Sequence, residues 1–551
     1  MQPTPIPPIP EETARVARAV YPKGNLYMKL RDEFGAFFDD ESFADLYPQK
    51  GKPAETPWRL ALVTLFQFLE GLTDRQAADA MSGQIDWKYA LSMELDEPGC
   101  DYSVLCEFRA RLVDGNAEDR LFEAVLNRFQ ERGLLRSRGR QRTDSTHLLQ
   151  AVRGLTRTEL VGETLRAALN ALAETAPEWL ASIAPSEWFD RYGRRMEQYR
   201  LPKGEKEREA WARQTGADGC RLLAALGTAP ASAAALDAVA ILRRVWIQQF
   251  RLQDDQVIVR SKEERPPSAQ TIRSPYDPEA RASKKRETVW TGYMVDLTES
   301  CDDDGTPDLV TQVMTTEATT SDHAALKEIH AALAEKERLP GEHWVDEGYT
   351  DAEVLTTSRE EYGVEVLGPV AEDRSWQASE GKGYDITGFT IDWEKETATC
   401  PEGRSSRAFR ASKDEREKEI WLVAFASEDC RTCPSRPQCT RNASRGRTLT
   451  LRPQREHEAL QQARERQKTE AFHRAYAVRA GMEGTLSQGV RRFGLRRSRY
   501  VGQAKTHFQN LMIATAMNLC RVYDWLTDKP RARTRESSLA RLGGQGSALA
   551  F

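Results

Sequence analysis

The stretch Thr143-Asp144-Ser145-Thr146 carries the first of three acids around which the chain is organised. The second is Asp346, in His343-Trp344-Val345-Asp346-Glu347-Gly348-Tyr349, and the third is Glu483, in Arg479-Ala480-Gly481-Met482-Glu483-Gly484-Thr485. Apolar residues follow Asp144, which predicts a short buried strand, and Asp346 ends a run typical of a strand tip. Tyr476, Arg479 and Glu483 are spaced by three and four residues, so they are predicted to share one helix face.

Three carboxylates brought together by a fold, without His or Cys beside them, suit hard divalent cations. Two such cations can stabilise the attacking and leaving oxygens of a phosphoryl displacement. The alternative is that these are ordinary surface acids, since the chain has 84 acidic residues and Asp, Ser and Thr also cap helices. Glu347 is the competing acid next to Asp346, and His147 is interpreted as structural.

The residues around the third acid resemble those of DDE transposases of bacterial insertion sequences, which have a ribonuclease H-like catalytic domain. Tyr476-x-x-Arg479-x-x-x-Glu483 is similar to the tyrosine, arginine and glutamate of their signature. The sequence from Glu483 to Lys505 resembles that of one subgroup of these transposases. The signature's lysine would fall at Val490, so Arg491 or Lys505 is the candidate for its basic role. The resemblance extends over residues 55–525.

The resemblance implies a protein that binds the terminal inverted repeats of an insertion sequence and catalyses metal-dependent DNA cleavage and strand transfer. Asp144, Asp346 and Glu483 would be catalytic and would hold Mg²⁺ or Mn²⁺. The implied partners are double-stranded DNA, as transposon ends and target, and a second copy of the chain in a homodimer on paired ends. Two alternatives stay open: a catalytically idle DNA-binding protein on the same scaffold, and a nuclease of the same fold that does not join strands.

Charge distribution points to a DNA contact surface beside the third acid. The net charge of the 551 residues is −5, yet residues 484–505 contain no acid. Because phosphate contacts are local, this basic segment is predicted to bind the DNA backbone, although a solvated helix face is the simpler interpretation. The predicted DNA-binding residues are Tyr476, Arg479, Arg491, Arg492, Arg496, Arg497, Arg499 and Lys505.

Size and hydropathy indicate a multidomain α/β protein without a membrane anchor. The chain is too long for one core, and 40% hydrophobic with 30% charged residues is a globular composition. No apolar run approaches the roughly 20 residues that span a bilayer. We therefore expect a cytoplasmic, nucleoid-associated protein without membrane contact.

The order of strand and helix patterns predicts a ribonuclease H-like core, a mixed sheet with helices, interrupted by two insertions. Strand-like runs at 288–297 and 309–314 flank an Asp-Gly turn, and a helix then leads to the strand that carries Asp346. The predicted parts are a disordered leader (1–20), a helical DNA-end-binding domain (21–135), the catalytic core (136–153, 287–370 and 456–528), a mostly α-helical insertion and loop (154–286), a β-rich insertion with a Cys cluster (371–455) and a disordered tail (529–551).

Two of these parts allow more than one interpretation. The short N-terminal helices suit either a helix-turn-helix DNA reader or a plain helical bundle. The all-α insertion is either a structural spacer or a holder of DNA or of a second protomer.

Four of the nine cysteines gather within the β-rich insertion. They are Cys400, Cys430, Cys433 and Cys439, and Cys430-x-x-Cys433 is a pair typical of zinc sites. The spacing is looser than in a standard zinc ribbon. A structural Zn²⁺ is one interpretation, and reduced structural cysteines, as expected in a cytosol, are the other.

Overall fold

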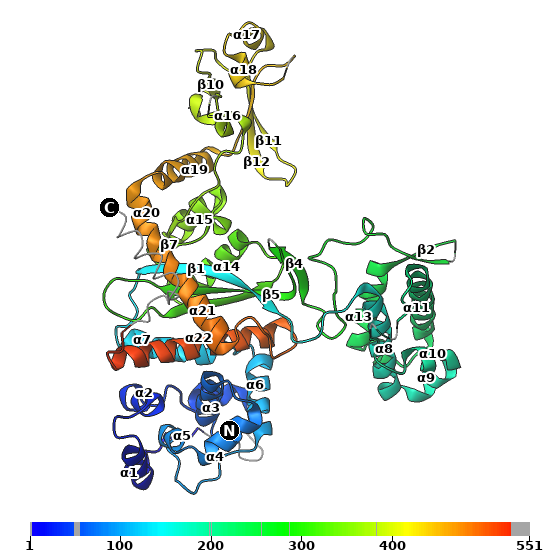
Figure 1. Ribbon diagram of the computed structural model, residues 1–551, viewed down its shortest axis with the longest axis vertical. Coiled ribbons are helices and arrows are strands. Elements are labelled where there is room, and N and C mark those ends of the chain that lie inside the picture. Colours follow the sequence, from blue (N-terminus) through cyan, green and yellow to red (C-terminus); the bar gives the residue numbers. More distant parts are fainter. Residues whose placement is uncertain are drawn as a thin grey trace, which may run out of the picture.

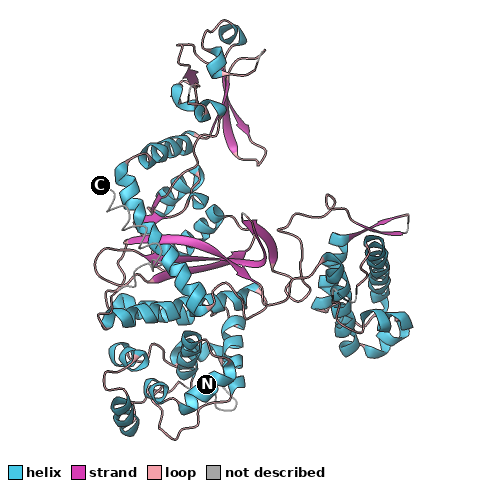
Figure 2. Cartoon of the chain, viewed as in Figure 1, coloured by secondary structure: helices cyan, strands magenta, loops and turns pink. Residues whose placement is uncertain are grey.

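A mixed sheet forms the centre of the computed structural model, which describes residues 3–48, 55–197, 199, 201–254, 256–285, 287–381, 383–442 and 444–530. In this part of the chain the sheet has six strands. Its main path is β4-β5-β1-β7-β8, and β6 also pairs with β5 (Figures 1 and 2). The strands are β4 (Arg281–Lys285), β5 (Thr288–Ser300), β1 (Arg140–Leu149), β7 (Glu342–Trp344), β8 (Glu365–Leu367) and β6 (Val310–Glu317).

The sheet changes direction at β1. This strand pairs antiparallel with β5, which pairs antiparallel with β4 and β6, whereas β7 runs parallel to β1 and β8 runs parallel to β7. Parallel neighbours need crossover connections, and helices α14 (Asp322–Glu335) and α15 (Ala352–Tyr362) lie in those connections. The predicted hairpin and following strands are thus present. The sheet also includes β4, which lies in the segment predicted to be a loop.

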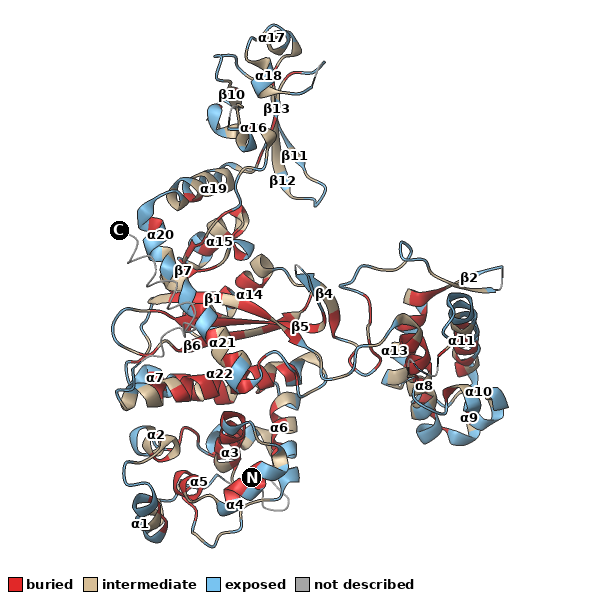
Figure 3. Cartoon of the chain, in the orientation of Figure 1, coloured by how far each residue is buried: buried red, intermediate tan, exposed pale blue. Residues whose placement is uncertain are grey.

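Helix α22 (Gln503–Leu526) connects the sheet to the N-terminal helices. It packs along β6 on one side and against α3 (Pro57–Glu70) and α7 (Arg120–Glu131) on the other. Asn518 completes the edge of β6, since its side chain accepts from Val310 N at 2.7 Å and donates to Val310 O at 2.8 Å. The helix is buried along most of its length (Figure 3).

The N-terminal helices surround α3, which is buried on nearly every side. An apolar helix without a polar face belongs inside a core, and this one ends at the predicted place because Gly71 adopts the left-handed conformation, with φ of 71°. Thr73 then begins α4 with a capping box. The other helices of this region are α1 (Glu11–Val20), α2 (Leu26–Phe34), α4 (Asp74–Gly83), α5 (Ile85–Ala90) and α6 (Tyr102–Asp114).

The prediction of a disordered leader over residues 1–20 is wrong for its second half. Residues 11–20 form α1, which packs on α5 and buries Thr13 and Ala17 completely. Thr13 donates a hydrogen bond to Met93 O at 2.8 Å. Pro10 stands just before the helix, where a proline does not interfere with helical hydrogen bonds.

The insertion between β1 and β4 has a core of its own and extends to the right of the sheet in Figure 1. Its longest helices are α8 (Arg157–Thr175), α11 (Glu205–Ala225) and α13 (Asp237–Gln249). The prediction of an all-α insertion needs one correction. The last part of the insertion contains a short helix, then α13, then strand β2 (Phe250–Gln253), which forms a hairpin with β3 (Gln256–Val259).

The segment between β8 and α19 (Gln454–Gln467) is β-rich and lies at the top of Figure 1. Strands β11 (Ala408–Lys413), β12 (Glu419–Ala424) and β13 (Thr448–Leu451) form one small sheet, and β9 (Thr390–Asp392) pairs with β10 (Thr397–Thr399). Helix α19 returns the chain to the central sheet by packing on α15.

The predicted disordered tail begins at residue 529 and lies outside the described residues from 531 onward. Among the helices of the described residues, none has the length and apolar character required to cross a membrane.

Candidate active site

Asp144 lies in the middle of β1, at the centre of the sheet. Side chains alternate along a strand, so Arg142, Asp144 and Thr146 share the face that α21 (Gly481–Phe493) and α22 cover, while Thr143 and Ser145 point to the other face. The Asp144 side chain is 16% exposed. Its carboxylate accepts a hydrogen bond from Ser145 N at 2.8 Å.

Asp346 lies beside Asp144 because of the strand register. The parallel pairing of β1 with β7 matches Arg140 with Glu342 and Arg142 with Trp344. Continued for two more residues, the same register brings Asp346 next to Asp144. Asp346 follows the end of β7 and is 51% exposed, and its carboxylate accepts a hydrogen bond from Glu347 N at 2.7 Å.

Arg479 joins these two acids. Its guanidinium donates to Asp144 at 2.7 Å and lies 3.6 Å from a carboxylate oxygen of Asp346. Burial raises the pKa of Asp144, the positive charge of Arg479 opposes this rise, and the negative charge of Asp346 adds to it. The two carboxylates therefore already share one cationic group.

Glu483 stands in the first turn of α21, exposed to solvent. It makes no hydrogen bond or ion pair with the described residues, and its charge acts on Arg479 through space. Across the described ranges, no three or more His, Cys, Asp or Glu side chains are arranged as a group that could hold a metal ion. The structure thus brings Asp144 and Asp346 together through Arg479, whereas Glu483 makes no bond to this group and lies close enough to Arg479 for its charge to act on it.

The predicted single helix through Tyr476, Arg479 and Glu483 is three consecutive helical segments. Tyr476 ends α20 (Glu470–Tyr476), Arg479 lies in the 3₁₀ turn η6 (Ala477–Ala480), and Glu483 begins α21. The tighter winding of a 3₁₀ turn changes the direction of the side chains relative to one α-helix. Arg479 is directed at Asp144 from this turn.

Tyr476 packs against the sheet as well as facing the acids. Its ring stacks on Phe472 and lies 6.4 Å from the ring of Trp344, which is buried. Burial raises the pKa of the Tyr476 hydroxyl to about 12, Arg479 lowers it, and Asp346 and Asp144 raise it. The hydroxyl therefore stays protonated and can donate a hydrogen bond.

The basic segment after Glu483 divides into anchored and exposed side chains. Arg496 donates to Thr146 Oγ1 at 2.8 Å, and the backbone of residues 496–498 hydrogen-bonds to Leu149 at the end of β1. Arg499 lies over the ring of Phe68 on α3. Arg492 lies over the ring of Phe493. The side chains of three exposed residues make no hydrogen bond or ion pair within the described part of the chain: Arg491, Arg497 and Lys505.

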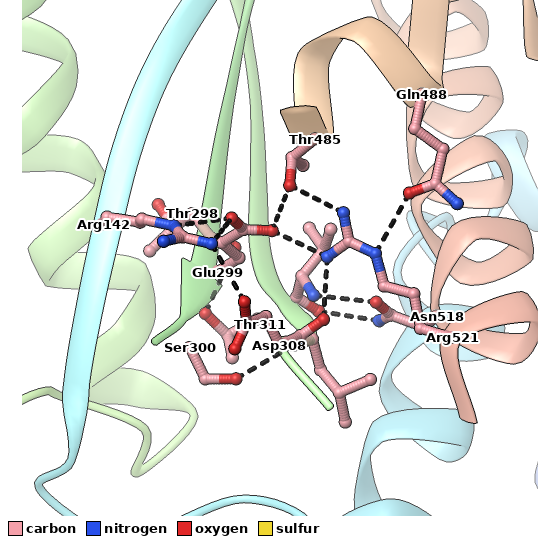
Figure 4. A network of polar contacts seen from close by, with 12 residues as sticks. Arg142, Thr298, Glu299, Ser300, Asp308, Thr311, Thr485, Gln488, Asn518 and Arg521 are labelled. Carbon is pink, nitrogen blue, oxygen red and sulfur yellow. Dashed lines mark hydrogen bonds and ion pairs between the residues drawn. The ribbon is translucent and has the colours of Figure 1, made fainter. Parts of the chain in front are cut away.

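A buried carboxylate below the site joins its separate elements (Figure 4). Glu299 on β5 is 0% exposed and receives hydrogen bonds from Arg142 at 2.7 Å, from Thr485 at 2.6 Å and from Arg521 at 2.7 Å. Burial alone would raise the pKa of Glu299, but Arg521, Arg142 and Thr485 together lower it. Glu299 is therefore held as a carboxylate between β1, α21 and α22.

Sequence reasoning missed this group of residues. Arg142 was visible only as part of a basic run, and the predicted strand ended at Leu297, two residues before Glu299. The signal was present in the alternation of β5, because Val295, Leu297 and Glu299 share one face and the first two are fully buried. An acidic residue on the face of a strand whose other residues are buried is itself expected to be buried. Because a buried charge needs a partner, such an acid predicts a buried ion pair.

The four clustered cysteines line one cavity of the β-rich insertion. Cys400 follows β10, Cys430 and Cys433 belong to the turn around α17 (Ser427–Arg431), and Cys439 ends α18 (Arg436–Cys439). The sulfur of Cys400 accepts from Arg404 N at 3.3 Å, and that of Cys430 accepts from Arg447 N at 3.4 Å. Burial raises the pKa of Cys439, with the other three thiols adding to the rise and Arg447 opposing it.

Comparisons with known proteins match the two ends of the chain. A family model described as "Transposase DDE domain" matches residues 399–523, which include the cysteine cluster and Glu483. A second, described as "Transposase domain (DUF772)", matches residues 16–111, the region of α1 to α6. Nothing among the curated proteins or the solved structures matches the chain. The two family matches together support a transposase of the DDE type.

Proposed function

We propose that the chain is a transposase that binds the terminal inverted repeats of an insertion sequence, cuts the DNA there and joins the 3′ ends to a target. The observation that carries this proposal is the pairing of Asp144 and Asp346 across two parallel strands, with Arg479 between them. The strand order β6-β5-β1-β7-β8, antiparallel on one side of β1 and parallel on the other, supports a ribonuclease H-like core.

The donor atoms at the site suit Mg²⁺ or Mn²⁺. Asp144, Asp346 and Glu483 offer only carboxylate oxygens, which hard divalent cations prefer. The guanidinium that Asp144 and Asp346 share shows that this position attracts positive charge. When bound there, two cations would lower the pKa of an attacking water or 3′-hydroxyl and stabilise the leaving oxygen.

The chain's own residues would hold the DNA. Arg479 and the hydroxyl of Tyr476 face the acids and can bind phosphates beside the scissile bond. Exposed Arg491, Arg497 and Lys505 can bind the DNA backbone, together with the outward parts of Arg492, Arg496 and Arg499. The N-terminal helices are the proposed readers of the terminal repeat. Since transposition acts on two ends, the working form would be a homodimer.

A strand-transfer assay tests this function. Labelled DNA carrying the flanking terminal repeats is incubated with Mg²⁺ and with the wild type or one of three variants, Asp144→Asn, Asp346→Asn and Glu483→Gln. Joined products that are lost in all three variants but kept in Glu347→Gln support the proposal. Cleavage of intact ends would favour a nuclease if no joined product forms, even when the ends are supplied already cleaved. Tight end binding without cleavage would favour an idle DNA-binding protein.

The cysteine cavity is the proposed site of one structural Zn²⁺. Four thiols from three turns reach one cavity, and two of their sulfurs already accept backbone N–H groups, the kind of outer contact that orients metal ligands. The core of this small insertion is limited to a few buried residues, so a metal would add stability that apolar burial does not supply.

Metal analysis tests the zinc site independently of DNA. Full-length protein purified without chelator should contain one zinc per chain. Cys433→Ser should lose it, whereas Cys106→Ser, which removes an exposed cysteine on α6, should keep it. Protein that contains no zinc while all four thiols react as reduced cysteines would show that the cluster is structural only.

A further inference from the structure

Three elements of the candidate site meet at one buried carboxylate. The strand that carries Asp144 contributes Arg142, two residues earlier, and the helix that carries Glu483 contributes Thr485, two residues later. Both bind Glu299 on β5, which has no exposed surface. Glu299 touches neither Asp144 nor Glu483 directly, yet it is bonded to a near neighbour of each.

Arg142 extends this connection to the turn that carries Arg479. Its guanidinium donates to Val478 O at 2.5 Å, one residue before Arg479, and lies 3.0 Å from a carboxylate oxygen of Asp308. A Cβ added to Gly481 would lie 2.3 Å from Arg142 Nη1. The first turn of α21 therefore rests directly on this guanidinium, and the absence of a side chain at Gly481 permits the contact.

Arg521 of α22 completes the network from the other side (Figure 4). It donates to Glu299 at 2.7 Å, to Thr485 Oγ1 at 2.6 Å and to Gln488 Oε1 at 3.1 Å. Arg142 and Arg521 thus both pair with the carboxylate of Glu299. The bond from Thr485 to the same carboxylate fixes the rotation of α21 about its axis. A fully hydrogen-bonded buried network of this kind specifies one arrangement of the elements that it joins.

We propose that Glu299 is a positioning residue, which sets the place of Glu483 and Arg479 relative to Asp144 through Thr485 and Arg142. This inference rests on the proposed function. Asp144 is fixed by the sheet and Asp346 by the strand register, but the side chain of Glu483 is exposed and makes no hydrogen bond or ion pair with the residues that the structure describes. Its position therefore depends on the docking of α21, which buries Met482 and Phe493 in the core and is hydrogen-bonded to Glu299 through Thr485.

The test compares Glu299→Gln with a matched control, Glu163→Gln, in the full chain. Glu163 is a buried glutamate of the helical insertion that likewise binds an arginine, Arg166 at 3.0 Å, and a hydroxyl, that of Tyr276 at 2.5 Å. Because small misplacements of reacting groups can cost about 100-fold in rate, Glu299→Gln is expected to lower kcat for end cleavage by about that factor. KM for the DNA end should change less than about threefold. This is smaller than the roughly fivefold change in an equilibrium constant that corresponds to about 1 kcal/mol. Glu163→Gln should leave kcat unchanged.

A milder variant and a double variant separate positioning from loss of folding. Thr485→Val removes the bond from α21 to Glu299 and the bond that Thr485 Oγ1 accepts from Arg521, but it leaves both arginines paired with Glu299, and it is expected to lower kcat as well. In the background of Glu483→Gln, adding Glu299→Gln should lower residual cleavage by a smaller factor than it does in wild type, because one of the two groups that Glu299 positions is already gone. Additive losses in that double variant, or an unchanged kcat in Glu299→Gln, would overturn the inference. Wild-type protein that does not cleave at all would instead overturn the proposed function.

Discussion

The guanidinium of Arg479 lies 2.7 Å from a carboxylate oxygen of Asp144 and 3.6 Å from one of Asp346, between the two acids of neighbouring parallel strands. It therefore occupies the space where the two carboxylates would share a divalent cation. A fixed positive charge competes with a cation for the same oxygens. In the structure Arg479 is paired with the carboxylates, and in the proposed function it would pair instead with the phosphate of a bound DNA end.

Replacing Arg479 with Gln is expected to tighten Mn²⁺ binding at pH 8 by roughly tenfold, about 1.4 kcal/mol, because the competing charge is removed. Cleavage should nevertheless become slower, since the phosphate loses its partner. Titration of Mn²⁺ by electron paramagnetic resonance gives the affinity. Arg474→Gln, which removes an exposed arginine of α20, serves as control, and weaker Mn²⁺ binding in Arg479→Gln than in this control would contradict the competition.

Gly481 and Gly484 offer a matched pair of substitutions on the first turn of α21. A Cβ on Gly481 would meet the guanidinium of Arg142, whereas one on Gly484 would have nothing within 4 Å. Gly481→Ala is expected to destabilise the protein by about 1–3 kcal/mol, as overpacking does. Gly484→Ala is expected to stabilise it by about 0.5–1 kcal/mol, because alanine favours the helix. Urea unfolding measures both, and equal effects would show that α21 does not rest on Arg142.

Two buried histidines predict how stability depends on pH. His330 Nε2 lies 2.8 Å from His343 Nδ1, and His343 Nε2 lies 2.6 Å from Thr143 Oγ1, next to Asp144. Burial lowers the pKa of His330 to about 4, and burial together with His330 lowers that of His343. Because histidines of the unfolded chain titrate near 6.5, the unfolded chain binds more protons between about pH 6.5 and pH 4, and stability must fall as the pH falls through this window.

Replacing His330 with Gln should make that loss of stability shallower. Urea unfolding at several pH values between 4.5 and 7.5 measures the slope. His323→Gln removes a half-exposed histidine from the same helix, α14, and should leave most of the pH dependence in place. A slope that is the same in His330→Gln and in wild type would exclude the buried pair as its source.

The N-terminal helices and the sheet are expected to unfold together. Phe68 of α3 lies against Phe508 of α22, with ring centroids 6.4 Å apart, and Phe508 is almost completely buried in a core that both regions share. Phe508→Ala should cost about 3–5 kcal/mol. Hydrogen exchange should show faster opening of α3 and β6 alike in this variant. Destabilisation confined to the helices would mean that they form an independent domain.

Local signals predicted the helices well because the residues that decide them are close in sequence. The run 58–69 is apolar on all sides and ends at Gly71, so both the helix and its end could be read directly. Helix α1 within residues 1–20 was harder to predict, because contacts of Thr13 and Ala17 with residues far along the chain stabilise it. The amphipathic pattern of residues 11–20 and the acids Glu11 and Glu12 in the first turn indicate a helix, but they do not reveal these distant contacts.

Part of the candidate site could be predicted, because several of its residues lie in short local motifs. The family resemblance indicated Asp144, Asp346, Arg479 and Glu483, and the structure brings the first three into contact. The support beneath them was not predicted, because Glu299 pairs with Arg142 and Arg521, which lie 157 and 222 residues away in sequence. A buried ion pair between such distant residues leaves no local pattern.

We propose that Asp144, Asp346 and Glu483 hold the cations that DNA cleavage requires. Replacing each carboxylate ligand with a thiol tests this proposal most directly. Each acid is replaced by Cys in turn, and end cleavage is compared in Mg²⁺ and in Mn²⁺, which accepts a sulfur ligand more readily than Mg²⁺ does. We predict that all three variants are inactive in Mg²⁺ and regain cleavage in Mn²⁺, while Glu347→Cys remains active in both. Full activity in Mg²⁺ of any of the three Cys variants would contradict the assignment of that acid.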